Sequence, residues 1–256
     1  SGPRALVASD TGVFHENTPQ ERLIARVAPR EGDEFTVEAI VTLESIDAGA
    51  AVRTIASRWN GDKSSPESHG WSLGVTGTKS AYKPRNLIVQ LVGEDDNMNT
   101  TYEVAASGLH LELQRPYHVI ASVSCSDHSV RFTVRDLSQP DAAPRTALVK
   151  HHIVGKLGTG QAQPVIGGLS RRTAHQFDGV INAVRIYGGT PIGETPQSDP
   201  QTWTGPGLAW RASDPLPATF SWSGGTSNAE SRDPQVRALA DLGHVLLNTN
   251  EFLYLH

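Results

Sequence analysis

Short segments in which apolar and polar residues alternate recur along most of the chain. In residues 35–43 every second residue is apolar and the others are mostly polar, as in a half-buried strand; the apolar positions are Phe35, Val37, Ala39, Val41 and Leu43. Similar alternating segments lie at 53–59, 71–75, 87–92, 109–113, 118–123 and 130–135. Because no helical period intervenes, the pattern predicts an all-β fold, an antiparallel β-sandwich of the jelly-roll type.

The segment 177–187 is apolar on both faces. Read as a regular strand, it places Val180, Val184 and Ile186 on one face. Ile181, Ala183 and Tyr187 then lie on the other. The segment therefore predicts a central strand that is buried on both sides.

The composition changes near residue 190, and the chain divides there into three expected parts. Residues 1–190 form the sandwich, with weak strands expected at 4–7 and 23–27. Residues 191–232 are rich in Pro, Gly, Ser and Thr but carry three Trp residues, so we expect a connector that packs partly on the sandwich, with a short strand at 208–211. Residues 233–256 begin with Asp233-Pro234 and continue with apolar residues at helical spacing, which predicts one C-terminal α-helix.

The charge of the chain argues against a nucleic-acid partner, and its hydropathy argues against a membrane span. The formal net charge of the 256 residues is −5, and no Lys/Arg cluster is longer than Arg171-Arg172, so nucleic acid is not an expected partner. No apolar run approaches the length of about 18 residues that a membrane span requires. Cys125 is the only cysteine, so no intrachain disulfide forms.

Several segments resemble laminin-G-like domains of the concanavalin A-like lectin/glucanase superfamily. Phe177–Tyr187 is similar to the family segment F-x-G-x-I-D-x-V-R-I-Y, with Asn182 in place of the usual Asp. Further similar segments follow in the family's order at 35–39, 53–58, 70–75, 116–121 and 165–168. The resemblance implies a concanavalin A-like jelly roll and a non-catalytic, lectin-like carbohydrate-binding module with a glycan as its partner.

The C-terminal segment carries a second resemblance. Residues 238–254 resemble the C-terminal end of large planctomycete proteins that combine cytochrome-c-like domains with domains of unknown function, although Gly243 stands where a Cys is common. This resemblance implies that the chain is the C-terminal part of a longer bacterial surface protein. It also implies an extracytoplasmic location and upstream domains as partners.

Catalytic patterns are missing from the sequence. Glycoside hydrolases built on this sandwich need two carboxylates on one strand face, and no E-x-D-x-E run lies within a predicted strand. The ten histidines include no H-E-x-x-H pattern, which argues against a transition-metal site. The sequence therefore predicts that the chain is not an enzyme.

Calcium is the one cofactor that the residues and the family resemblance suggest. Calcium takes six to eight oxygen ligands, and the loop Glu94-Asp95-Asp96 is the densest acidic cluster. Asp178 and Asn182 are further oxygen donors. The competing interpretation is that these are solvated turn residues.

The expected sugar site groups aromatic and polar residues. Sugars are recognised by an aromatic platform with hydrogen-bonding neighbours, and the nearest such grouping is Trp59, Asn60, Asp62, Tyr82 and Arg85. Trp59 is the expected surface platform, whereas Trp71 is expected in the core. The alternative is a structural or protein–protein interaction domain without a glycan ligand, which an extended apolar patch around the final helix would favour.

Overall fold

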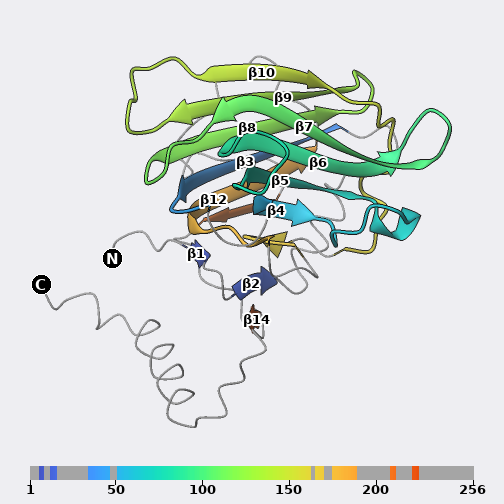
Figure 1. Ribbon diagram of the computed structural model, residues 1–256, viewed down its shortest axis with the longest axis horizontal. Helices are drawn as coiled ribbons and strands as arrows, with labels where there is room; N and C mark the ends of the chain where they lie inside the picture. The colour runs from blue at the N-terminus through green and yellow to red at the C-terminus, as the bar shows by residue number, and fades with distance from the viewer. Residues whose placement is uncertain are drawn as a thin grey trace, which may run out of the picture. The chain divides into compact units, whose positions relative to one another are not determined.

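The computed structural model describes residues 34–46, 51–162, 165–169 and 175–188, and the backbone of four short strands at 6–8, 12–15, 208–211 and 221–224 (Figure 1). Within these residues the chain is a β-sandwich, as predicted, and each pair of named strands is antiparallel. The helix expected within 233–256 lies outside the described residues, so it stays a prediction. The boundaries of the three expected parts also stay predictions.

Two sheets, each of seven strands among the described residues, form the sandwich. In order across the sheet, sheet A contains β1 (Leu6–Ala8), β12 (Gly179–Gly188), β3 (Glu34–Leu43), β8 (Pro116–Ser124), β9 (Ser129–Asp136) and β10 (Arg145–Lys150), with β13 (Leu208–Arg211) also pairing with β12. Sheet B contains β14 (Ser221–Gly224), β2 (Gly12–His15), β11 (Val165–Ile166), β4 (Val52–Arg58), β5 (Gly70–Thr76), β6 (Asn86–Glu94) and β7 (Thr100–His110). One short 3-10 helix, η1 (Pro66–Ser68), lies between β4 and β5.

The hydrophobic core lies between the two sheets. Alternate residues of each central strand point into it, among them Val37 of β3, Val119 of β8 and Leu73 of β5. Trp71 is 1% exposed and lies against Phe35, with 5.2 Å between the ring centroids, so the expectation of a core Trp71 is confirmed. The remaining residues of the sheet A strands point away from the core and form a second, outer face.

A β-bulge in β12 corrects the predicted faces of the closing strand. The register against β3 shifts between Ile181 and Ala183, so Asn182 is an extra residue. Ile181 therefore lies in the core with Val184 and Ile186, on the face that strict alternation gives to Val180. Ala183 packs against Ile40 on the outer face. Alternation read from the sequence cannot reveal a β-bulge. The extra residue exchanges the core-facing and outward-facing positions in the part of the strand on one side of the bulge.

The predicted strand positions fail at two edge strands and at β2, which was not predicted and lies between β14 and β11; the strand expected at 23–27 lies outside the described residues. The strand expected at 109–113 is instead β7 at Thr100–His110, and β10 at Arg145–Lys150 was not predicted. Each is the last strand of its sheet, so its residues are mostly half-buried or exposed and the apolar period is weak. The strand expected at 208–211 is present as β13, and both β13 and β14 come from the predicted connector.

Candidate functional site

Polar side chains gather on the outer face of sheet A. This face carries Thr36 and Glu38 of β3, His118 and Ser122 of β8, Arg131, Thr133 and Arg135 of β9, and Arg185 and Tyr187 of β12. They come together because each alternates with a residue that points into the core. The arrangement joins segments that lie far apart in the sequence.

Glu38 is the centre of this face. Its carboxylate oxygen Oε2 accepts a hydrogen bond from Arg185 Nε at 2.7 Å and lies 2.6 Å from Arg185 Nη2. Its other oxygen, Oε1, accepts from the Tyr187 hydroxyl at 3.3 Å. The Arg185 guanidinium also lies over the Tyr187 ring, 4.6 Å from its centroid. Both carboxylate oxygens are therefore engaged, while the Arg185 side chain keeps 21% of its surface exposed.

Burial perturbs the titration of these groups. Burial raises the pKa of the Glu38 carboxyl, and this effect outweighs the charge and hydrogen bond of Arg185, which lower the pKa. Burial, followed by the nearby Glu38 carboxylate, raises the pKa of the Tyr187 hydroxyl to about 12. Tyr187 therefore remains a neutral hydrogen-bond donor at physiological pH.

His118 continues the polar face across β8. It lies opposite Ile40 of β3 on one side and opposite Arg135 of β9 on the other. Burial lowers the pKa of the His118 imidazole to about 4, and Arg135 and Arg185 contribute in the same direction. Two outward-facing positions further along β8, beyond the buried Ile120, Ser122 Oγ accepts a hydrogen bond from the Thr36 hydroxyl at 3.0 Å. His118 is thus a neutral imidazole beside Arg135, its neighbour on β9.

Several titratable groups with shifted pKa values on one surface are typical of a functional site. Ion pairs with a purely structural role also shift pKa values, so the exposure of the members matters. Glu38 and His118 are buried, whereas Arg135, Arg185 and Tyr187 are half-buried and Arg131 is exposed. The face therefore combines a fixed polar interior with accessible guanidinium and phenol groups.

Trp59 does not lie at the surface as expected. It is 2% exposed, its ring stacks on Tyr102 with 5.7 Å between centroids, and its indole N–H donates to the Asp62 carbonyl at 2.5 Å. Asn60 Oδ1 accepts from the Asp62 amide, and Asp62 Oδ1 accepts from Ser64. These polar groups shape the loop after β4, and Trp59 packs between sheet B and that loop.

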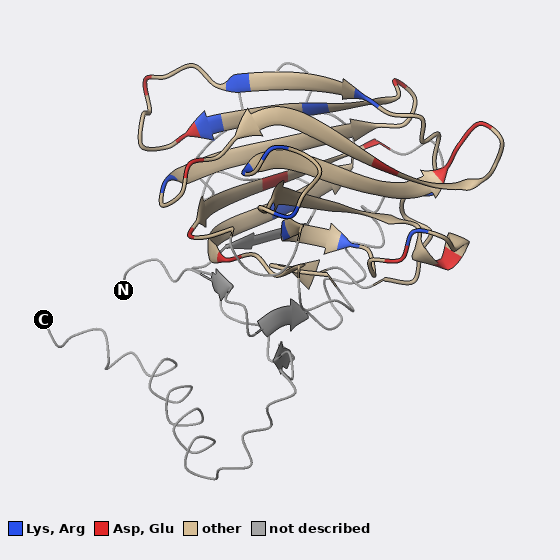
Figure 2. Ribbon diagram, viewed as in Figure 1, with Lys and Arg blue, Asp and Glu red and all other residues tan. Residues whose placement is uncertain are grey.

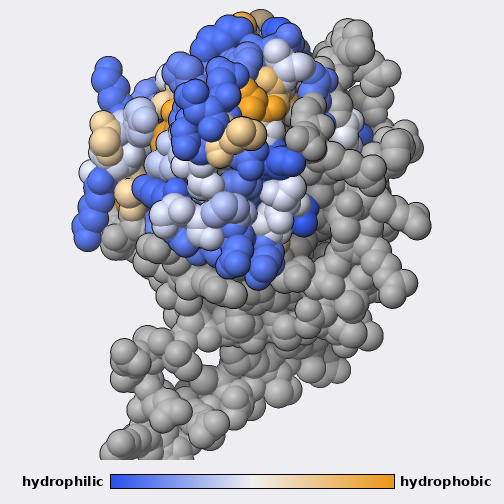
Figure 3. Space-filling view, turned by 90° about the vertical axis from the view of Figure 1, so that its right-hand side faces the viewer, coloured by the Kyte–Doolittle hydropathy of each residue, from blue (hydrophilic) through white to orange (hydrophobic). Residues whose placement is uncertain are grey.

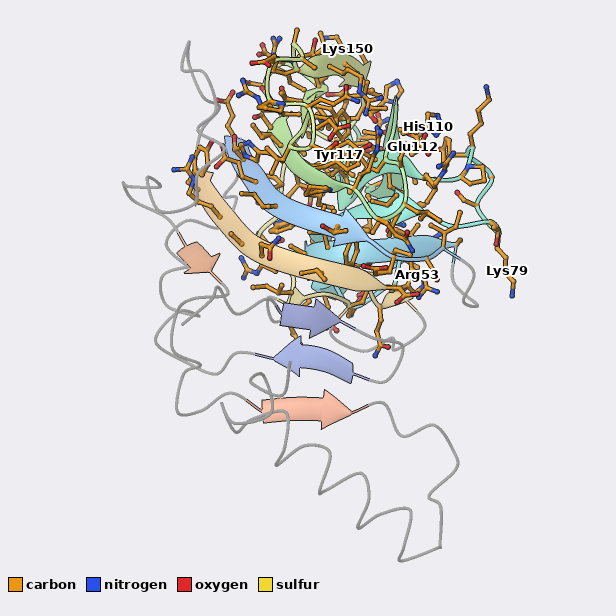
Figure 4. The ribbon with its side chains drawn as sticks, turned by 90° about the vertical axis from the view of Figure 1, so that its left-hand side faces the viewer. Arg53, Lys79, His110, Glu112, Tyr117 and Lys150 are labelled. Carbon is orange, nitrogen blue, oxygen red and sulfur yellow. The ribbon has the colours of Figure 1, made fainter. Side chains whose placement is uncertain are left out.

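Tyr82 and Arg85 lie at the opposite end of β5 from Trp59. Arg58 pairs with Trp71 near the start of β5, whereas Tyr82 and Arg85 follow its last residue, Thr76. Arg85 forms an ion pair with Glu112, and Figure 4 shows Glu112 beside His110 and Tyr117 at this end. Tyr82 is 40% exposed. The structure therefore does not bring the expected sugar-site residues into one group.

The acidic loop between β6 and β7, red at the right of Figure 2, is organised by its own amides. Asp95 Oδ1 accepts from the amides of Asn97 and Asn99, each at 2.9 Å, and Asp95 Oδ2 accepts from the Thr101 hydroxyl. The backbone hydrogen bond from Asn99 is the first cause that lowers the pKa of the Asp95 carboxyl. This bonding is that of a turn residue.

The remaining expected calcium ligands lie elsewhere. Asp178 is at the end of the sandwich where β3 finishes, because its carbonyl accepts from the Glu44 amide and its carboxylate accepts from Ser45. Glu94 ends β6, and Asn182 is the bulged residue of β12. Among the described residues, no three His, Cys, Asp or Glu side chains are placed to hold a metal ion.

Sequence reasoning missed Glu38, His118, Arg185 and Tyr187 as a group. One signal was available, since Arg185 and Tyr187 are polar residues two apart in the strand predicted to be buried on both faces. Glu38 is likewise a charged residue at the centre of a strongly apolar strand. A charge in such a place needs a partner. The partner itself is 147 residues away, and nothing in the alternation identifies it.

Comparison with known proteins identifies similar folds but no family to which the chain belongs. No protein-family model and no curated protein sequence matches the chain. A protein from Bacteroides ovatus, for which carbohydrate binding has been proposed, is 14% identical over 82% of this chain and 51% of its own, with a TM-score of 0.51. This chain therefore spans about half of that protein's length.

Two other solved structures are similar at lower TM-scores. The Ruminococcus gnavus IT-sialidase CBM40, solved with alpha2,3 sialyllactose, is 11% identical over 73% of this chain and 92% of its own, with a TM-score of 0.49. A pentraxin from Limulus polyphemus is 13% identical over 69% of this chain and 75% of its own, with a TM-score of 0.37. At 14% identity, the likeness to the Bacteroides ovatus protein shows a shared fold and nothing about function.

Proposed function

We propose that the chain is a non-catalytic carbohydrate-binding module whose site is the outer face of sheet A. The observation that carries the proposal is the anchoring of Glu38, whose carboxylate holds both Arg185 and Tyr187 in fixed positions. Binding sites work best when their contact groups are held in place before the ligand arrives. The fold shared with the Bacteroides ovatus protein supports this proposal.

The chemistry of the face suits a sugar. Tyr187 supplies a partly exposed aromatic ring with a polar tip, and such rings pack on the apolar faces of sugar rings. Arg135, Arg185 and Thr133 supply hydrogen-bonding groups that are half-buried rather than fully solvated. Because Glu38 and His118 on the central strands are buried, a glycan would contact the half-buried side chains of β9 or of β12 at the margins of this face.

A glycan-array screen tests the proposal. We expect the unmodified chain to bind at least one glycan, and Arg135→Ala or Tyr187→Phe to weaken that binding. The matched control is Arg145→Ala on β10, because Arg145 lies in register with the core residue Val134 and donates to the His110 carbonyl, away from the face. Silence against a broad panel would refute the proposal.

The same screen tests the predicted site around Trp59. Lys63 lies over the Tyr102 ring, 3.8 Å from its centroid, in the cluster that contains Trp59. If Lys63→Ala abolished binding and Arg135→Ala left it unchanged, the site would lie on sheet B, with Asn60 and Asp62 in the adjacent loop. Tyr82→Ala and Arg85→Ala test the more distant members of the predicted group.

Calcium and location complete the proposal. We propose calcium assistance through the loop Glu94-Asp95-Asp96, on the strength of the family resemblance, and a repeat of the screen with calcium and with a chelator tests it. We also propose that the chain works outside the cytoplasm as part of a longer bacterial protein, which cell fractionation of the native organism would check. Among the described residues, no helix is long and apolar enough to cross a membrane.

A purely structural or protein-binding role is less well supported. The large hydrophobic side chains that are exposed among the described residues are Tyr82, Met98, Leu113 and Leu148. They come from three different loops and from β10, so they do not share one element. Figure 3 shows one face on which hydrophilic residues dominate and orange is confined to a small area near the top. An extended apolar patch does not appear on that face.

A further inference from the structure

Strand β10 is an open edge of sheet A. It is the last strand of the sheet, and among the described strands it pairs with β9 alone. Figure 1 shows it as the outermost strand, at the top of the view. Proteins usually protect such an edge with charged residues or proline, because its free amide and carbonyl groups can pair with another strand. The middle of β10, residues 146–149, carries no charged side chain, so this edge is open to pairing.

The hydrogen bonds to β9 determine which backbone groups of β10 point to the open side. The His151 amide donates to the His128 carbonyl at 3.0 Å, in the register that β10 and β9 share. Hydrogen-bonded and non-bonded pairs alternate along an antiparallel ladder. The residues of β10 whose amide and carbonyl groups point away from β9 are therefore Thr146, Leu148 and Lys150.

The side chains of these three residues are exposed on the outer face of sheet A. Leu148 is 55% exposed and lies opposite Arg131 of β9. Ala147 and Val149, by contrast, pack against the core. An exposed apolar side chain at the centre of an open edge favours association, because a partner strand would remove it from water.

The outward-facing residues of β10 are complementary to themselves. Two antiparallel copies of β10, related by a two-fold axis at Leu148, place Leu148 opposite Leu148 of the second copy. Thr146 then lies opposite Lys150 of the second copy, so no two cations are opposed among the outward-facing residues. All the outward-facing amide and carbonyl groups of β10 find partners in this register, and the two leucines cover each other.

The neighbouring registers are poorer. An axis moved by one residue towards the start of β10 places Lys150 opposite Pro144, which has no amide hydrogen. An axis moved by one residue towards the end places Thr146 opposite His152, whose amide already donates to the Glu103 carboxylate at 3.0 Å. Backbone pairing and side-chain burial therefore select the same register.

We propose that two copies of the chain associate through β10, antiparallel and with the two-fold axis at Leu148. The axis is perpendicular to the sheet, so the outer faces of the two copies of sheet A join into one surface. This dimer does not depend on sugar binding. The paired segment is short, which places the interface at the small end of specific interfaces, and we expect a dissociation constant of about 10 to 100 μM.

Sedimentation velocity of the full chain, from about 5 to about 500 μM, tests the proposal. We expect a monomer at the low end of this range and mostly dimer at the high end. Leu148→Lys places two cations opposite each other and should raise the dissociation constant at least about tenfold. Because Leu148 is exposed, the melting temperature of this variant at low concentration should stay unchanged.

Met98→Lys is the matched control for this substitution. Met98 is 81% exposed, and it lies in the loop between β6 and β7 instead of on β10. The same change from an apolar side chain to a cation should therefore leave the dimer intact. A chain that stays monomeric up to the highest concentration, or a Leu148→Lys dimer of unchanged affinity, would overturn the proposal.

Cysteine cross-linking tests the register. Directly opposed residues of a hydrogen-bonded pair have Cα atoms about 5.5 Å apart, which suits a disulfide. Leu148→Cys should therefore form a covalent dimer with oxidised glutathione, whereas Thr146→Cys, which lies opposite Lys150 of the second copy, should form little. Cys125 is 1% exposed and does not compete. Equal cross-linking of the two variants would refute the two-fold axis at Leu148.

Discussion

Arg185 and Glu38 form an ion pair across neighbouring strands of sheet A, with 2.6 Å between Arg185 Nη2 and Glu38 Oε2. The carboxylate is almost fully buried, so the cost of removing it from water is offset mainly by this one guanidinium and by Tyr187. The pair therefore matters to folding as well as to the site.

Replacing Arg185 tests this double role. Arg185→Met leaves the Glu38 carboxylate buried without its cation, which should reduce the free energy of unfolding by about 3 kcal/mol in urea titrations. The double variant Glu38→Met, Arg185→Met removes both charges and should lose clearly less than the sum of the single variants. Additive losses in this cycle would show that the two side chains are not energetically coupled.

The pH dependence of stability should carry a contribution from His118. Its pKa is about 4 in the fold and about 6.5 in an unfolded chain, so the folded state binds fewer protons between these values. The contribution is fully present above pH 6.5 and is lost as the pH falls towards 4, by about 3 kcal/mol in total.

Comparison with His118→Gln isolates this contribution. His151 and His69 also have lowered pKa values and act in the same direction, while the raised pKa of Glu38 acts in the opposite one. All three groups are present in both proteins, so their effects cancel in the difference. Equal losses of unfolding free energy between pH 7 and pH 4 in the two proteins would contradict the assignment.

Trp59 is expected to contribute to stability more than to binding. Trp59→Ala removes a buried ring that packs on Tyr102, Val92 and Leu169, and should cost about 3 to 5 kcal/mol. Trp59→Phe keeps most of the packing and should cost less. Thermal unfolding measures both, and a Trp59→Ala variant of normal stability that lost glycan binding would instead support the sugar site predicted from the sequence.

Asp95 is expected to order the loop between β6 and β7 without a metal ion. Asp95→Ala should speed hydrogen exchange at the amides of Asn97 and Asn99 several-fold, while Asp95→Asn keeps an acceptor oxygen and should show a smaller effect. Because the Asp95 pKa is lowered, the ordering is present at neutral pH and is lost as the pH falls through that lowered value. Calcium-dependent protection of these amides would favour a metal site.

Gly179 shows how far local sequence reasoning extends. It belongs to the Phe177-Asp178-Gly179 segment, and its φ of +151° with the Thr42 carbonyl in close approach explains why a side chain does not fit there. The resemblance placed a glycine at this position of the family segment, but only the pairing of β12 with β3 shows the contact that requires it.

The sequence by itself determined the sandwich. Alternation with a period of two assigns each central residue to the core or the outer face, because side chains of a strand point to opposite sides. This was sufficient for β3, β8 and β9, which have neighbours on both sides. It was insufficient for β7 and β10, where an edge position weakens the apolar period.

Only the tertiary structure decided the site. The bulge at Asn182 sets which residues of β12 face outward, and the register then pairs Arg185 with Glu38 and His118 with Arg135. Trp59, which looks like a surface platform by its place at a strand end, is covered by its own loop and Leu169. These relationships depend on strand order and register, which bring together residues whose separation in the chain leaves no local trace.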